Sequence, residues 1–176
     1  MSRQYSDPIP AIEYVFELEG LTFTDDPDDP GGETSYGVTK NTARYYGYKG
    51  DMKDFSRDDA IGVYTGIWNK LRLGEVKDQE LANEIFEFAV NVGNARGIKF
   101  IQRAVNLVDN VVEDRLVVDG LTGPNTLKGI NAFPAKRLII MLNAIQASEY
   151  IRIAEKNPTM EKYVKGWLEK RAFNKV

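Results

Sequence analysis

Two residue types are missing from the chain. None of the 176 residues is cysteine, which excludes disulfide bonds and thiolate chemistry. None is histidine, which excludes imidazole bases, histidine-containing catalytic triads and the usual zinc cages. Any catalysis must therefore use carboxylates, hydroxyls, amides, lysine or tyrosine, and we expect neither a metal nor another cofactor.

The chain also lacks a strong excess of charge of either sign. The chain has 23 basic and 26 acidic side chains, which leaves a net charge of −3, and it has no long basic tract. Nucleic-acid binding usually depends on many lysine or arginine contacts to phosphates. We therefore expect no nucleic-acid partner.

Long hydrophobic runs are absent as well. No stretch approaches the ~20 apolar residues that cross a bilayer, and the first residues lack the apolar segment of a signal peptide. We expect a product without a membrane anchor that is soluble where it is made. The hydrophobic content of 43% is nevertheless enough for a packed interior, in one compact domain or in two lobes that share a core.

Helix signals recur along the chain, and strand signals are few. Capping residues and prolines predict helices that begin at Asp7-Pro8, near Thr39, at the Ser56–Asp59 capping box, at Asp78, after Asn94, and at Thr126, Pro134 and Pro158. Residues 22–24 and 36–38 are strand-like pieces around a Pro/Gly/Asp loop, which predicts a small β-ribbon. The predicted fold class is mainly α, with this ribbon in the N-terminal part.

Glu19 lies at the end of the first predicted helix. Ile12, Val15 and Phe16 fall on one apolar face, and Glu19 is the next position on that stripe. Loss of hydration there favours the neutral carboxyl group and raises its pKa, which suits a general acid. The alternative is a solvated or ion-paired glutamate of no catalytic importance, which is common at helix ends.

The loop that follows contains Asp28 and Asp29, with Thr34 a few residues beyond. It has three interpretations. Asp, Pro and Gly are ordinary turn formers. A calcium loop counted from Asp26 would have Gly31 in place but not Pro30 or Gly37. Thirdly, one aspartate could hold a water molecule together with Thr34, opposite Glu19. A protonated acid and a water-holding carboxylate are what hydrolysis of a glycosidic bond requires.

Further candidates for substrate contacts are Tyr36, Glu87, Asn91 and Gln102. Glu87 and Asn91 lie one turn apart on the same side of a predicted helix, so they could face a cleft or form a buried polar pair that caps the turn at Gly93. For Gln102 we favour a structural role. Both tryptophans, at positions 68 and 167, continue apolar stripes and are predicted to belong to the core.

Several blocks resemble the glycoside hydrolase family 108 muramidases, which have a helical peptidoglycan-binding part at the C-terminus. The blocks are Glu19-Gly20, Asp29-Pro30-Gly31-Gly32-Glu33-Thr34-Ser35-Tyr36-Gly37-Val38-Thr39, Phe86–Gly93, Ile101–Ala104, Asp119–Leu127 and Gly166–Arg171. The resemblance implies a lysozyme-like fold and cleavage of the glycan between N-acetylmuramic acid and N-acetylglucosamine, with Glu19 as proton donor. It covers nearly the whole chain, which we interpret as a single lysozyme-like domain with a catalytic lobe of about residues 1–77 and a peptidoglycan-binding lobe of about residues 78–176.

The chain departs from the family pattern in two places. Leu21 and Thr22 stand where the family has Gly and Tyr, so the wall next to the acid differs. The family also places its aspartate nine positions after the glutamate. Asp28 has that spacing, whereas Asp29 has the following Pro-Gly-Gly motif. We favour Asp29 for the motif and keep Asp28 open.

The resemblance also indicates partners and location. The expected substrate is the glycan strand of peptidoglycan, and we expect a monomer. A muramidase without a signal sequence fits a phage endolysin that accumulates in the host cytoplasm and reaches the wall through a separately encoded pore, a holin. The competing hypothesis is a peptidoglycan-binding or virion-associated structural protein without activity.

Overall fold

The structure, a computed structural model, describes residues 4–19, 22–25, 32–108 and 115–173, and of Glu19 it describes the backbone alone. The chain divides into two compact units, Met1–Glu87 and Phe88–Val176. The division falls inside the helix α4, Gln79–Val92. Each unit is described below by itself.

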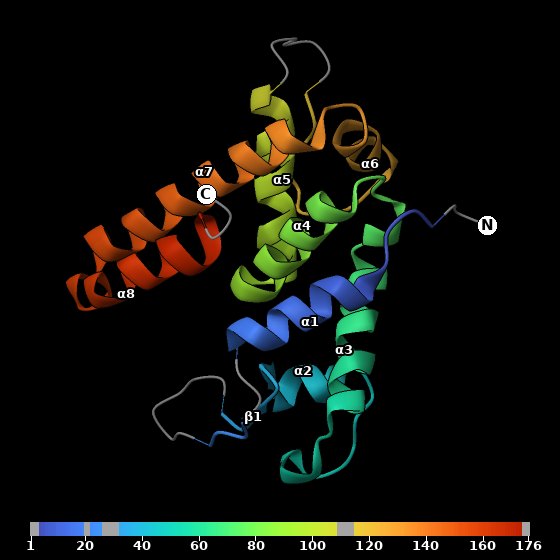
Figure 1. Ribbon diagram of the computed structural model, residues 1–176, viewed down its shortest axis with the longest axis vertical. Helices are drawn as coiled ribbons and strands as arrows, with labels where there is room; N and C mark the ends of the chain where they lie inside the picture. The colour runs from blue at the N-terminus through green and yellow to red at the C-terminus, as the bar shows by residue number, and fades with distance from the viewer. Residues whose placement is uncertain (1–3, 20–21, 26–31, 109–114, 174–176) are drawn as a thin grey trace. The chain divides into compact units, whose positions relative to one another are not determined.

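The N-terminal unit is a set of helices with one small hairpin (Figure 1). Its elements are α1 (Pro8–Glu19), β1 (Thr34–Ser35), β2 (Val38–Thr39), α2 (Lys40–Tyr45), the short 3-10 helix η1 (Met52–Asp54), α3 (Arg57–Lys70), the 3-10 helix η2 (Leu73–Glu75) and the first part of α4. This mainly α architecture with a two-stranded antiparallel sheet confirms the predicted fold class.

The helix starts follow the capping signals in the sequence. The Asp7 carboxylate accepts a hydrogen bond from the Ile9 backbone N–H at 2.9 Å, and Asp78 accepts one from the Leu81 N–H at 2.9 Å. At the start of α3, Ser56 and Asp59 form the predicted capping box, with bonds in both directions. Local side-chain chemistry thus sets where these helices begin.

Aromatic rings form much of the core of the N-terminal unit. Phe16 of α1 lies edge-on to Tyr64 of α3, with ring centroids 5.8 Å apart. Trp68 of α3 in turn packs against Phe86 of α4 at 5.5 Å. All four side chains are buried, as are Ile12 and Val15 of the apolar stripe on α1. The predicted core position of Trp68 is confirmed.

The hairpin differs in detail from the predicted ribbon. Ser35 pairs with Val38 and Thr34 with Thr39, and Thr24 bridges Thr34 from the other side. Tyr36 and Gly37, predicted as strand residues, instead form the two-residue turn, with φ of 52° and 72°. That prediction was wrong because a tight hairpin needs two residues with positive φ to match the twist of its strands.

The C-terminal unit contains the end of α4, α5 (Asn94–Val108), α6 (Pro124–Ile130), α7 (Ala135–Lys156), the 3-10 helix η3 (Pro158–Met160), α8 (Glu161–Trp167) and the π-helical turn η4 (Leu168–Ala172). The predicted stop at Gly93 is confirmed, with φ 93°. The helix predicted from Thr126 begins two residues earlier, because Pro124 occupies its first position.

Packing in the C-terminal unit centres on α5 and α7, which contact each other, while α7 also contacts α8 and η4. Gly97 of α5 allows close approach to α4, since a Cβ there would lie 2.6 Å from the Cα of Ala89. Trp167 is half-buried against Tyr150, with ring centroids 5.1 Å apart.

A membrane-spanning helix would need a longer and more apolar run than any helix in the described part of the chain has.

Candidate functional site

The end of α1 packs against the hairpin, and this contact joins two parts of the candidate site. Glu19 is the last residue of α1. Phe16, one helical turn earlier, lies edge-on to Tyr36 of the hairpin turn, with ring centroids 5.8 Å apart. The Tyr64 hydroxyl donates a hydrogen bond of 2.9 Å to the Tyr36 carbonyl and fixes the turn from the α3 side. Tyr36 therefore has a packing role, and its predicted substrate contact stays a prediction.

The two candidate aspartates, Asp28 and Asp29, lie outside the described residues. So does most of the loop considered as a calcium site. The nearest described residues are Asp25 before the loop and Gly32 after it. Gly32 has φ 63°, a left-handed conformation that a side chain would strain.

Thr34 is held in the hairpin by its backbone, and its side chain bonds to the described residue Gly32. Its N–H and carbonyl exchange two hydrogen bonds with Thr24, of 2.9 and 2.8 Å. The Thr34 hydroxyl donates to the Gly32 carbonyl at 3.0 Å. A hydroxyl has a single hydrogen, so Oγ1 can act towards any further partner only as an acceptor.

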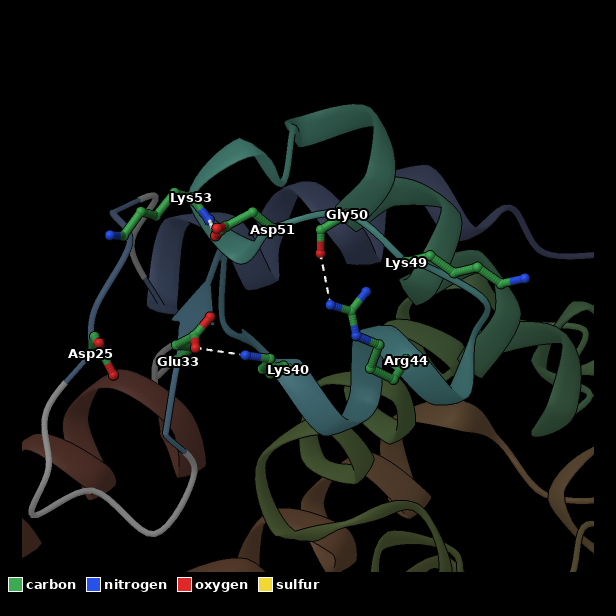
Figure 2. Close-up of a pocket in the computed structure, with 8 residues that line it drawn as sticks. All are labelled: Asp25, Glu33, Lys40, Arg44, Lys49, Gly50, Asp51 and Lys53. Atoms are coloured by element: carbon green, nitrogen blue, oxygen red, sulfur yellow. Dashed lines mark hydrogen bonds and ion pairs between the residues drawn. The ribbon is translucent and has the colours of Figure 1, made fainter.

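A polar pocket of about 350 Å³ lies beside this hairpin (Figure 2). Four basic and three acidic side chains line it, together with Gly50: Lys40, Arg44, Lys49, Lys53, Asp25, Glu33 and Asp51. Figure 2 shows Glu33 and Lys40 facing one another, and Arg44 reaching the Gly50 carbonyl. The pocket therefore presents charge of both signs next to the segment that carries Thr34.

Part of this charge is already used inside the protein. Lys40 and Glu33 form an ion pair of 2.7 Å. The Arg44 guanidinium donates to the carbonyls of Tyr48 and Gly50, both at 2.8 Å. The four cations disfavour a divalent metal ion in the pocket, whereas hydroxyl and carboxylate groups of a ligand would find both donors and acceptors.

Glu33 and Lys40 were not among the candidates from the sequence. Their pairing follows from the hairpin register: Thr34 faces Thr39, so Glu33 faces Lys40, and the Lys40 N–H donates to the Glu33 carbonyl at 2.8 Å. Opposite charges in facing positions are a recognisable cross-strand signal. The signal depends on placing the turn at Tyr36-Gly37, which was missed.

Glu87 and Asn91 differ in their surroundings. Glu87 is buried, whereas Asn91 is exposed. The Asn91 amide lies 3.0 Å from the Tyr150 hydroxyl. Turned so that its oxygen faces Arg171, it accepts two guanidinium hydrogen bonds at 2.7 and 3.1 Å. Asn91 thus contacts side chains of α7 and η4, and a role in substrate contact stays a prediction for both residues.

Gln102 is buried and fully engaged within the C-terminal unit. Its oxygen accepts from the Gly120 N–H at 2.9 Å, and its nitrogen lies within hydrogen-bonding distance of Asp119 Oδ1, Thr126 Oγ1 and the Leu121 carbonyl. These bonds hold the loop before α6 against α5. They fit the structural role that we favoured for Gln102.

The comparisons with known proteins agree with this organisation. Residues 12–93 match the family described as Glycosyl hydrolase 108, and residues 96–172 match the family described as Predicted Peptidoglycan domain. The solved structure of SagA from Brucella abortus is similar, with a TM-score of 0.72 and 26% sequence identity over 95% of this chain and 94% of that chain. None of the curated proteins compared with the chain matches it. Residues 12–93 thus match the glycosyl hydrolase 108 family, and together with the peptidoglycan-domain match over residues 96–172 this identifies the chain as a peptidoglycan hydrolase.

Proposed function

We propose that the protein is an N-acetylmuramidase that cleaves peptidoglycan between N-acetylmuramic acid and N-acetylglucosamine, with Glu19 as the proton donor. The observation that carries this proposal is the position of Glu19 at the end of α1, one turn after the residue that packs on the hairpin, within the segment that matches glycosyl hydrolase 108. The buried stripe of Ile12, Val15 and Phe16 supports an acid at the edge of the apolar core.

The water step would use Thr34 and an aspartate of the preceding loop. Because the Thr34 hydroxyl donates to Gly32, it can accept one hydrogen of a water molecule. An aspartate carboxylate would accept the other hydrogen, which leaves a lone pair of the water oxygen directed at the anomeric carbon. We favour Asp29 in this role and keep Asp28 as the alternative.

We expect the reaction to invert the anomeric configuration. Inverting enzymes hold their two carboxyl groups ~6.5–9.5 Å apart so that water fits between them, whereas retaining enzymes hold them ~5–5.5 Å apart. An acid on a helix and a base on a separate loop favour the wider spacing. The anomer first released from a defined muropeptide decides the question, and a retained configuration would rule out the inverting scheme.

The biological role that we propose is host lysis by a phage endolysin. The enzyme would accumulate as a monomer in the host cytoplasm and reach the periplasm and wall after a separate holin opens the membrane. Lysis of host cells by the protein with and without a co-expressed holin tests this role. Lysis without any holin would contradict it.

The test of the catalytic proposal is Glu19→Gln, which keeps the shape of the side chain but has no acidic proton. We expect the rate of peptidoglycan clearing to fall about a thousandfold, with an unchanged circular dichroism spectrum. Glu17→Gln is the matched control, because Glu17 is an exposed residue of the same helix. A Glu19→Gln variant that clears purified sacculi at a near-normal rate would refute the assignment.

A further inference from the structure

The C-terminal unit contains a groove of about 730 Å³ that no catalytic candidate lines. The extended segment after residue 114 forms one wall, and α6 with the residues that follow it forms the other. Cationic side chains line the groove beside aliphatic and aromatic ones: Arg115, Val117, Leu121, Lys128, Ala132 and Phe133.

Two side-chain amides hold the first wall in place. Gln102 and Asn106 are one turn apart on α5. Asn106 exchanges two hydrogen bonds with the backbone of Leu116, donating to its carbonyl at 2.9 Å and accepting from its N–H at 2.8 Å. Gln102 fixes the same segment four residues later, at Gly120. Because both amides form hydrogen bonds with backbone groups of the segment, the segment is already held in place without a ligand.

The segment held in this way displays apolar side chains to solvent. Val117 is 77% exposed and Leu121 is 67% exposed. Within the described chain, the backbone groups of Val117 and Val118 make no hydrogen bond. An immobilised segment with exposed aliphatic groups and open peptide groups is suited to contact another extended chain.

Among the described residues of the lining, the basic side chains outnumber the acidic one. Arg115 and Lys128 are exposed and form no ion pair with another described residue. The acidic residue of the described lining is Asp119, whose carboxylate accepts hydrogen bonds from Gln102 at 2.8 Å and from the Leu121 N–H at 2.8 Å. These bonds lower the pKa of Asp119 below its ordinary value. The described lining therefore carries two cations against one carboxylate, and this excess of positive charge favours a ligand with carboxylates.

We propose that this groove binds the stem peptide of peptidoglycan, with Arg115 and Lys128 pairing with its carboxylates and Val117 and Leu121 contacting its alanine methyl groups. The proposal rests on peptidoglycan being the substrate. A stem peptide is short, extended and acidic, with small side chains, which matches the groove in charge and in the size of its apolar contacts. A bare glycan fits less well, since sugar rings favour open aromatic faces, and the aromatic residue in the described part of the lining, Phe133, is half-buried.

The test is titration of the full-length protein with a soluble stem tetrapeptide, L-Ala–D-Glu–diaminopimelate–D-Ala, and separately with a peptide-free glycan tetrasaccharide. We expect Arg115→Ala and Lys128→Ala each to raise the Kd for the tetrapeptide about fivefold, as for an exposed ion pair. Val117→Asp places a negative charge near the carboxylates of the peptide and should raise the Kd for the tetrapeptide more than about tenfold. The controls Lys156→Ala and Ile140→Asp change exposed residues of α7 outside the groove and should leave the Kd unchanged.

Three results would overturn the proposal: no tetrapeptide binding, equal losses in the control variants, or a glycan affinity that Val117→Asp removes while tetrapeptide affinity persists. Clearing of sacculi, measured in parallel, separates this proposal from the catalytic one. A protein that clears sacculi without binding tetrapeptide contradicts the groove assignment alone. A protein that binds tetrapeptide through the groove but leaves sacculi intact supports the groove and contradicts the muramidase activity.

Discussion

Both units hold an irregular segment against helices, but they do so by different means. In the N-terminal unit, mainly backbone hydrogen bonds hold the segment, between Thr24 and Thr34 and across the hairpin, and the Tyr64 side chain adds one bond at the turn. In the C-terminal unit, the side chains of Gln102 and Asn106 hold it. The first arrangement leaves side chains such as that of Thr34 available for chemistry, whereas the second uses polar side chains for architecture.

This difference explains why a polar side chain supports the fold in one unit and is dispensable for the fold in the other. A buried amide that bonds several backbone groups resembles a site residue in sequence, yet its removal would unfold a loop. A hydroxyl in a short hairpin resembles a strand residue, yet its removal would leave the backbone bonds in place. Substitutions that separate stability from activity can therefore break or sharpen the comparison.

The largest effect on stability is expected for Gln102→Met, which keeps the size of the side chain but removes its hydrogen bonds. It leaves the buried Gly120 N–H unpaired, and we expect a loss of about 3 kcal/mol in the free energy of unfolding. Urea denaturation measures it. Gln146→Met is the matched control: Gln146 is equally buried but, among the described residues, forms one hydrogen bond, to Tyr150, and its loss should cost about 1 kcal/mol. Equal losses in the two variants would contradict a special role of Gln102 in the loop.

Thr34→Val should instead lower activity strongly and change stability little. It removes the acceptor for water, so the rate of peptidoglycan hydrolysis should fall about 10- to 100-fold. The free energy of unfolding should change by less than about 1 kcal/mol, because the backbone bonds to Thr24 remain. Thr34→Ser should keep most of the activity, and Thr24→Val, in the same ribbon, should keep all of it. Normal activity in Thr34→Val would remove Thr34 from the mechanism.

The smallest effect concerns the titration of Asp119. Its pKa is lowered in the folded protein, first by the Gln102 side chain and then by the Leu121 N–H. Its contribution to stability is therefore present above the unfolded-state pKa, ~3.9, and is lost as the pH falls through the lower folded-state value. Gln102→Met should raise the pKa of Asp119 towards its ordinary value, as measured by carboxyl NMR. The pKa of Asp59, which Ser56 lowers, should not move and serves as the control.

The sequence predicted the helices because their signals are local. Ser56 and Asp59 cap α3 by themselves, and the buried face of Ala60, Tyr64 and Trp68 repeats with the helical period. It did not predict the turn at Tyr36, since a tyrosine with φ of 52° is unusual. There the ring contact with Phe16 and the hydrogen bond from Tyr64 stabilise the conformation, and both partners are far away in the sequence.

For the candidate site, the sequence suggested side chains but could not show what they contact. The position of Glu19 at a helix end followed from the apolar period, whereas the ion pair of Glu33 with Lys40 followed only from the hairpin register. Likewise, Gln102 was recognised as structural in character, but its partners near residue 120 are brought to it by the tertiary fold. The aspartate of the loop stays a prediction, shared between Asp28 and Asp29.

The most direct measurement of the central claim is mass spectrometry of the products released from purified sacculi, after reduction with borohydride. The proposed muramidase exposes the reducing end of N-acetylmuramic acid, so the predicted products are disaccharide peptides that end in N-acetylmuramitol. Products that end in N-acetylglucosaminitol, or peptides freed from intact glycan, would contradict the account.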